Sequence, residues 1–86
     1  MPDDTVQVWL VTREYTPRDL IVLEYATPDG ERYVRQEKAA HAAASSVTAA
    51  IDVPEDKLAP TDDPDVDRYR EEAQRMRDEH DPDDEI

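Results

Sequence analysis

The stretch 20–36, LIVLEYATPDGERYVRQ, contains the clearest local structural signal of this chain. Its centre, TPDG at 27–30, is a turn sequence, because proline fixes φ at its own position and glycine accepts a positive φ. The flanking runs LIVLEYA at 20–26 and ERYVRQ at 31–36 contain β-branched and aromatic residues, which favour strands. We therefore predict a β-hairpin centred on this turn.

A further strand is predicted before the hairpin, over residues 5–12. This stretch, TVQVWLVT, is apolar on both faces, with Leu10 on one and Trp9 on the other. Residues 13–19 should form a polar connection that Pro17 interrupts. In a small sheet with both faces exposed to solvent, apolar and polar residues would alternate more regularly along each strand. We therefore expect both faces to be covered by other parts of the protein or by a partner. The cover comes either from two helices, one on each face, or from a second subunit that packs over Trp9.

The stretch after the hairpin allows two interpretations. Residues 37–46, EKAAHAAASS, are rich in alanine and free of glycine and proline, which favours a helix. Residues 47–53, VTAAIDV, return to alternation and are predicted to form a fourth strand. The alternative is one longer helix from Glu37 through Ile51, which Ala49 and Ala50 would tolerate. Residues 54–60 should be a turn segment, with Leu58 in the core.

The last helix is predicted to begin at Asp63, with Asp63 as N-cap and Pro64 at the first helical position. One apolar stripe recurs at three- and four-residue steps and comprises Val66, Tyr69, Ala73, Met76 and His80. The outer side carries Arg75 within reach of two glutamates, Glu71 and Glu72. We expect this helix to pack its stripe on the sheet.

Together these elements predict an α+β fold in the order β-β-β-α-β-α. It consists of a three- to four-stranded, mostly antiparallel sheet and two helices. Residues 5–80 should form a single domain, between a flexible N-terminal tail at 1–4 and a flexible acidic tail at 81–86 that frays into solvent.

Net charge is the strongest compositional signal. Twenty-three acids against ten bases give −13 on 86 residues. Concentrated salt screens such self-repulsion, so the composition indicates a halophile's cytoplasm. The alternative is an ordinary acidic protein or a disordered acidic tail. The chain has no cysteine and no apolar run near the ~18 residues of a membrane span, so we expect a soluble, cytoplasmic protein without membrane contact.

Few residue patterns suggest chemistry. Asp63, Asp65 and Asp67 have the spacing of calcium-loop ligands, but Arg68 stands where that loop requires glycine. His80 with the aspartates of 81–84 is a weak candidate for a cation. His41 has Ser45 and Ser46 nearby but no third orienting group, which a catalytic triad needs. We therefore predict no catalytic, cofactor-binding or metal-binding residues, no small-molecule substrate and no enzymatic activity.

The sharpest functional candidate is the hairpin region. Residues 13–38 hold six acids and five bases, a net charge of only −1, and tyrosines interleave with arginines there. Arginine and tyrosine are typical of protein interfaces. The predicted interaction surface comprises Trp9, Tyr15, Tyr25, Arg32, Tyr33 and Arg35. We predict a protein-interaction or self-associating module, such as a homodimer through a sheet face. The alternative is an accessory protein that binds single-stranded nucleic acid through the same hairpin.

Two short motifs carry a resemblance to known proteins: YATPDGER at 25–32 and MRDEHDPDDE at 76–85. With these motifs the chain resembles a group of small acidic proteins from halophilic archaea, over most of its length. The resemblance implies a habitat and a lineage. It implies no activity and no site residues, because both motifs are turn and tail sequences without chemistry.

Overall fold

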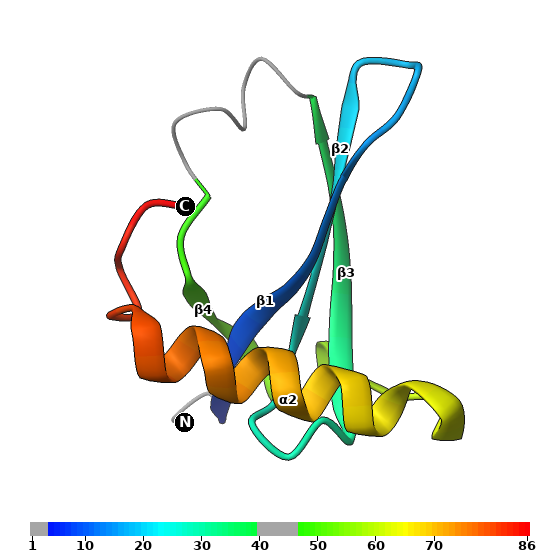
Figure 1. Ribbon diagram of the computed structural model, residues 1–86. Coiled ribbons are helices and arrows are strands. Elements are labelled where there is room, and N and C mark those ends of the chain that lie inside the picture. Colours follow the sequence, from blue (N-terminus) through cyan, green and yellow to red (C-terminus); the bar gives the residue numbers. More distant parts are fainter. Residues whose placement is uncertain (1–3, 40–46) are drawn as a thin grey trace.

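The structure is a computed structural model, and it describes residues 4–39 and 47–86. Five strands form one antiparallel sheet in the order β4-β1-β2-β3-β5, and one long helix crosses it (Figure 1). The elements are β1 (Thr5–Tyr15), β2 (Leu20–Ala26), β3 (Arg32–Ala39), β4 (Ala50–Pro54), the 3-10 helix η1 (Glu55–Lys57), β5 (Ala59–Pro60) and α2 (Asp63–Glu79). The predicted α+β class and antiparallel pairing are confirmed, whereas the predicted strand and helix numbers differ in detail.

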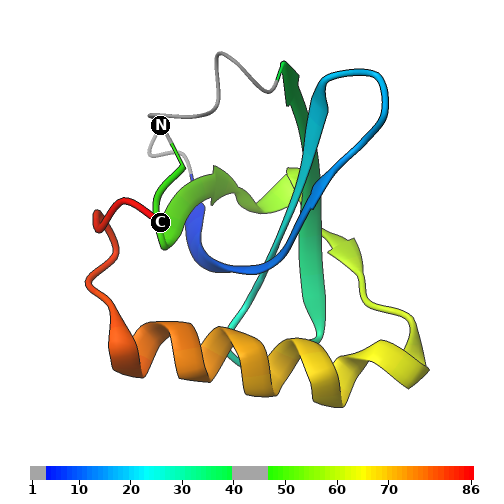
Figure 2. The same cartoon turned by 45° about the horizontal axis from the view of Figure 1, so that its top comes forward.

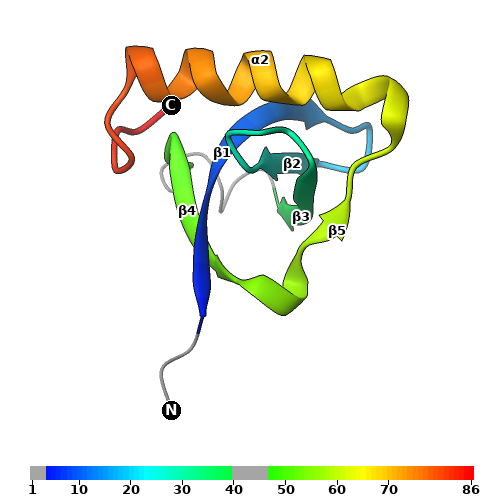
Figure 3. The same cartoon turned by 90° about the horizontal axis from the view of Figure 1, so that it is seen from below.

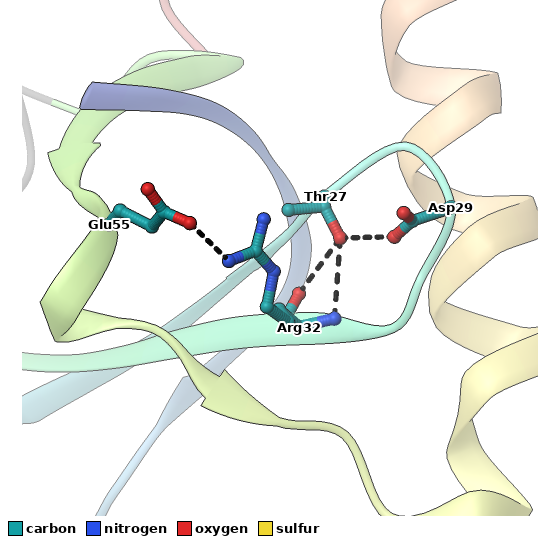
Figure 4. A network of polar contacts seen from close by, with 4 residues as sticks. All are labelled: Thr27, Asp29, Arg32 and Glu55. Carbon is teal, nitrogen blue, oxygen red and sulfur yellow. Dashed lines mark hydrogen bonds and ion pairs between the residues drawn. The ribbon is translucent and has the colours of Figure 1, made fainter. Parts of the chain in front are cut away.

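The central hairpin is confirmed, and polar contacts lock its turn (Figure 4). Gly30 has a φ of 75°, and its N–H donates to the Thr27 carbonyl at 2.8 Å. The Asp29 carboxylate accepts from the Thr27 hydroxyl and, at 2.9 Å, from the N–H of Glu31. These two hydrogen bonds hold the pKa of Asp29 below its ordinary value because they favour the charged form, and the bond from the Thr27 hydroxyl has the larger effect.

Strand β3 is longer than predicted, and this corrects the helix predicted over 37–46. Residues 37–39 continue β3 and pair with residues 20–22 of β2, so a helix starting at Glu37 is wrong. The rest of that predicted helix, residues 40–46, lies outside the described residues. Of the strand predicted over 47–53, residues 50–53 are confirmed within β4, whereas residues 47–49 precede it and Thr48 makes only an isolated bridge to Glu85. The pairing of β4 with β1 excludes a helix running through Ile51. Ladder hydrogen bonds to neighbouring strands outweigh the modest helix propensity of alanine-rich sequence.

Strand β1 is also longer than predicted and contains a bulge. It runs to Tyr15, so only residues 16–19 connect it to β2. Leu10 lies opposite Tyr25 and Thr12 opposite Glu24, which leaves Val11 as an extra residue between them. An extra residue reverses the alternation beyond it. Arg13 and Tyr15 therefore lie on the Leu10 face of the sheet instead of the Trp9 face.

The sheet is curled, which gives it an inner and an outer face (Figure 3). Its edge strands, β4 and β5, are joined by only four residues, η1 and Leu58. A flat sheet of five strands would separate its edge strands by about 19 Å. Because the four-residue link between β4 and β5 is short, the sheet must curl. The inner face holds one apolar cluster, and Leu58 packs against it as predicted. Its buried members are Val8, Leu10, Ile21, Leu23, Tyr25, Val47 and Val53.

Helix α2 covers the outer face, where Trp9 is buried to 2% exposure among Ala49, Ala50 and Ala73 (Figure 2). The predicted stripe is confirmed in its centre, because Tyr69 and Ala73 are the buried residues of α2. The N-cap is Asp62, one residue before the predicted position. Within the described residues, α2 is the helix that covers the outer face, and Trp9 is buried there by residues of its own chain. A second subunit is therefore not needed to cover Trp9.

The C-terminal segment 81–86 does not fray as expected. It runs beside residues 47–50, with hydrogen bonds from Ala49 N–H to Asp84 O (2.9 Å) and from Ile86 N–H to Val47 O (3.0 Å). The Ile86 side chain packs against both apolar clusters. A single apolar residue after four acids was too weak a signal to predict this docking from sequence.

Candidate interaction surface

Strands β1, β2 and β3 form a ribbon, and α2 packs on only one end of it (Figure 1). The covered end contains the 27–31 turn, where Gln74 Nε2 donates to the Pro28 carbonyl at 3.1 Å. The opposite end carries the β1–β2 connection and projects past the helix (Figures 1 and 2). We call this projecting part the ribbon end, and it comprises residues 13–15, 20–24 and 35–39.

Charges separate between the two faces of the ribbon end. Cross-strand pairing places Tyr15, Ile21 and Lys38 in one row of the inner face. The neighbouring inner row contains Arg13, Leu23 and Gln36, so neither inner row has an acid. The outer face has Glu14, Val22 and Glu37 in one row, followed by Thr12, Glu24 and Arg35. In a chain of net charge −13, the inner side of the ribbon end is therefore locally cationic.

Tyr15 is the one large apolar side chain exposed among the described residues, at 62%. The Arg13 guanidinium carbon lies 5.7 Å from the centre of its ring, and Arg13 Nη2 donates to the Tyr15 hydroxyl at 2.9 Å. Arg13 Nη1 donates to the Ile86 carbonyl at 2.9 Å. Arg13 thus joins the exposed tyrosine to the docked C-terminal segment. A side chain held in this way loses less rotamer entropy when it binds.

The six residues of the predicted surface do not form one surface. Trp9 and Tyr25 are buried at 2% and 1% exposure, on opposite faces of the sheet. Burial raises the pKa of the Tyr25 hydroxyl, although the nearby Arg13 charge opposes it. Tyr33 lies edge-on to Tyr69 of α2, with ring centres 5.8 Å apart.

The remaining three predicted residues are accessible but separated. Arg32 pairs with Glu55 of η1 at 3.3 Å, near the covered end of the ribbon (Figure 4). Tyr15 and Arg35 lie on the ribbon end, on its inner and outer faces respectively. Tyr33 and Arg35 do share a strand face, as expected from their spacing, but Tyr33 packs against α2 whereas the Arg35 side chain is 56% exposed. The bulge in β1 and the placement of α2 explain this dispersal.

The edge of β3 that faces away from β2 was not predicted from the sequence, because residues 37–39 were expected to be helical. Strand β5 pairs only with Arg32 and Tyr33, after which no described strand lies beside β3 on that side. The backbone from Val34 to Ala39 is therefore an unpaired edge within the described residues. Alternation in RYVRQEK could have revealed a longer strand, had the alanines not favoured a helix.

The candidate metal ligands and catalytic residues named from the sequence lie apart or in ion pairs, as far as they are described. No group of three or more histidine, aspartate or glutamate side chains among them is placed to hold an ion. Asp65 and Asp67 instead pair with Arg68 and Arg70 of the same helix. His80 Nδ1 lies 3.7 Å from an Asp84 oxygen. His41, Ser45 and Ser46 lie outside the described residues.

A shallow cleft of about 190 Å³ lies between β1 and α2, with Arg13 and Arg75 on its walls. Arg75 pairs with Glu72, and this contact raises the pKa of its guanidinium. The cleft is smaller than the roughly 300 Å³ at which sites for small molecules begin.

Comparison with known proteins places the chain but gives no activity. A family model described as "Family of unknown function (DUF7967)" matches residues 2–86. Neither the search of curated proteins nor the search of solved structures gives a match. In the part of the chain that the structure describes, no helix combines the length and apolarity needed to cross a membrane.

Proposed function

The chain belongs to this family of unknown function, and we propose from its own structure that it is a non-enzymatic module that binds proteins through the ribbon end. The observation that carries the proposal is the uncovered β3 edge, on the same ribbon end as the exposed Tyr15, which lies two strands away on β1. Strand edges offer N–H and C=O groups to an added strand, and tyrosine is enriched at the centre of interfaces. The ribbon end also escapes the acid excess that would repel most partners.

The test is retention of proteins from native cell lysate in molar KCl by the immobilised chain. We expect wild type to retain specific proteins, copies of the chain included, and the variants Tyr15→Ala and Glu37→Pro to retain at least about 10-fold less. The N–H of Glu37 points away from β2, so proline there blocks the edge without breaking the β2–β3 ladder.

The matched control is Glu71→Ala, which changes an exposed acid of α2 that is not part of the ribbon end. It should retain the same proteins as wild type. Equal retention by all four proteins would show that the ribbon end is not the contact surface. Retention no greater than that of empty beads would overturn the interaction module itself. Circular dichroism of each variant checks that the fold is intact.

A second candidate, binding of single-stranded nucleic acid, is favoured by the acid-free inner rows with Arg13, Tyr15 and Lys38. Stacking on tyrosine and contacts from arginine to phosphate are the means of such binding. The overall charge of −13 and high salt both oppose it. Titration of labelled RNA with wild type and Tyr15→Ala distinguishes the two functions, since a protein-binding module leaves the RNA signal unchanged.

We further propose that the module works in the cytoplasm of a halophile. The support is the −13 charge, because the screening length falls from about 10 Å at 0.1 M salt to about 3 Å at 1 M. We expect the free energy of unfolding to fall by about 2 kcal/mol or more on dialysis from molar KCl to about 0.1 M. Urea titration followed by circular dichroism measures this change.

The control for the salt effect is a variant in which exposed acids of α2 are neutralised: Glu71→Gln, Asp78→Asn and Glu79→Gln. Its stability should depend less on salt, because three repelling charges are gone. A wild-type chain equally stable at both salt concentrations would contradict adaptation to high salt.

A further inference from the structure

The hydrogen-bonding groups of β3 alternate between its two sides. Arg32 O accepts from Thr27 N–H at 3.0 Å on the β2 side, whereas Glu31 O accepts from Thr61 N–H at 2.9 Å on the β5 side. Even-numbered residues of β3 therefore bond to β2, and odd-numbered residues point outward. Along the unpaired edge, the outward N–H and C=O groups belong to Arg35, Glu37 and Ala39.

The neighbouring segment leaves this edge early. Strand β5 lies opposite Tyr33 at Ala59, and η1 turns the chain away at Lys57. The side chains beside the free edge are accessible, since Arg35 and Glu37 are 56% and 53% exposed. Their charged ends lie 3.9 Å apart, so each is held only loosely by the other.

We propose that the partner of this edge is a second copy of the chain, paired antiparallel through β3 about a two-fold axis at Gln36. The inference rests on the proposed function and names the partner of the ribbon end. Such pairing would join two five-stranded sheets into one continuous sheet. Arg35 of each copy would lie opposite Glu37 of the other, in hydrogen-bonded pairs.

Charge selects this register from its neighbours. Only residues whose backbone N–H and C=O groups point to the free edge can form hydrogen-bonded pairs with a second copy. Odd-numbered residues of β3 must therefore lie opposite odd-numbered residues of the partner strand. A two-fold axis at Arg35 sets two arginines opposite each other, and an axis at Glu37 sets two glutamates opposite each other. Like charges directly opposite are destabilising in a sheet. The axis at Gln36 alone gives two opposite-charge pairs.

The resulting contact is small. It contains about four backbone hydrogen bonds and two exposed ion pairs, and it buries less than the ~1,200 Å² of a standard interface. Two copies that each carry −13 repel one another unless salt screens them. We therefore expect a reversible dimer that forms at high protein concentration in molar KCl.

Sedimentation in molar KCl tests the pairing. Wild type should dimerise, and Arg35→Glu or Glu37→Arg should each weaken dimerisation about 10-fold, because each creates two like-charge pairs. The double variant Arg35→Glu/Glu37→Arg should recover wild-type affinity. An equimolar mixture of the two single variants should also form a dimer, since one copy then carries two acids and the other two bases.

A cysteine at position 36 provides a second test, because the chain has no cysteine of its own. In the proposed register the two residues at 36 form a non-hydrogen-bonded pair with Cα atoms about 4.5 Å apart, a separation that a disulfide spans. Gln36→Cys should therefore form a covalent dimer under mild oxidation. Glu71→Cys, on the outer side of α2, should not.

Several results would overturn the proposal: a wild type that stays monomeric, single variants that dimerise like wild type, a double variant that stays weak, or a Glu71→Cys that links as fast as Gln36→Cys. A monomeric wild type whose retained lysate proteins are lost in Glu37→Pro would overturn the self-pairing alone. The protein-binding function of the ribbon end would then still stand.

Discussion

Replacing Gly30 with alanine should lower the free energy of unfolding by about 3 kcal/mol, enough to lower Tm by more than about 12 °C. Gly30 has a φ of 75°, which costs an L-residue about 1–2 kcal/mol. A Cβ atom there would also collide with the Val66 carbonyl oxygen and lie 2.6 Å from the Arg70 nitrogen. Both obstacles are backbone atoms of α2, so the helix must shift to admit the methyl group.

Two control variants separate strain from collision. Asparagine tolerates positive φ, so Gly30→Asn should remain nearly as unstable as Gly30→Ala if the collision with α2 dominates. Asp19 also has a positive φ, of 59°, but lies in the β1–β2 connection away from α2. Asp19→Gly should change stability by no more than about 1 kcal/mol. Thermal unfolding in molar KCl measures all three, and a Gly30→Ala that melts like wild type would contradict the close approach of α2 to the turn.

Replacing Trp9 with alanine should cost about 3–5 kcal/mol, the range for a large aromatic side chain removed from a core. The indole is 2% exposed and packs against three alanines, Ala49, Ala50 and Ala73. The alanines cannot fill the space that the indole would leave, and the partly buried Val11, Met76 and Ile86 beside them would have to move to fill it. Most of the stability of a domain of this size would be lost.

Phenylalanine is the matched control at this position. The indole Nε1 is buried and has no hydrogen-bond partner in the described part of the chain, so Trp9→Phe forfeits no hydrogen bond. We expect it to cost only about 1–1.5 kcal/mol. Urea unfolding followed by circular dichroism measures both variants, because the chain has no other tryptophan for fluorescence. Equal losses for alanine and phenylalanine would reveal a hydrogen bond to the indole.

The burial of Trp9 also changes how a sheet-face dimer can be tested. A charge at this position, as in Trp9→Glu, would be buried without a partner and should unfold the chain. Loss of a dimer in that variant would therefore not report on a contact between subunits. The exposed residues of β3 are better probes, since Arg35→Glu and Glu37→Arg leave both apolar clusters intact.

Local sequence was sufficient to predict those elements for which residue composition, hydrophobic pattern and turn or cap residues all indicate the same structure. The turn at 27–30 combines proline and glycine between two apolar runs, and the structure has a hairpin there. Asp62, Asp63 and Pro64 precede a regular stripe, and α2 begins within one residue of the predicted start. Alternation over 47–53 indicated a strand in spite of two alanines, and β4 occupies residues 50–53 of that range.

The errors arose where distant contacts decide the outcome. Residues 37–39 favour a helix by composition, yet pairing with 20–22 makes them strand. The segment 81–86 resembles a solvated tail, yet hydrogen bonds to residues 47–50 and the packing of Ile86 hold it on the sheet. In both cases the stabilising partner lies far away in the chain, where a local pattern has no access to it.

The charge of −13 follows from composition alone, and the α+β class, the hairpin and the amphipathic last helix follow from patterns among residues a few positions apart. Which side chains share a surface depends instead on contacts between distant parts of the chain. One extra residue at Val11 moved Arg13 and Tyr15 to the inner face, and α2 buried Trp9. Within the described residues, β3 has an unpaired edge because η1 turns the chain away after two paired residues, and this depends on which strands are neighbours in the sheet.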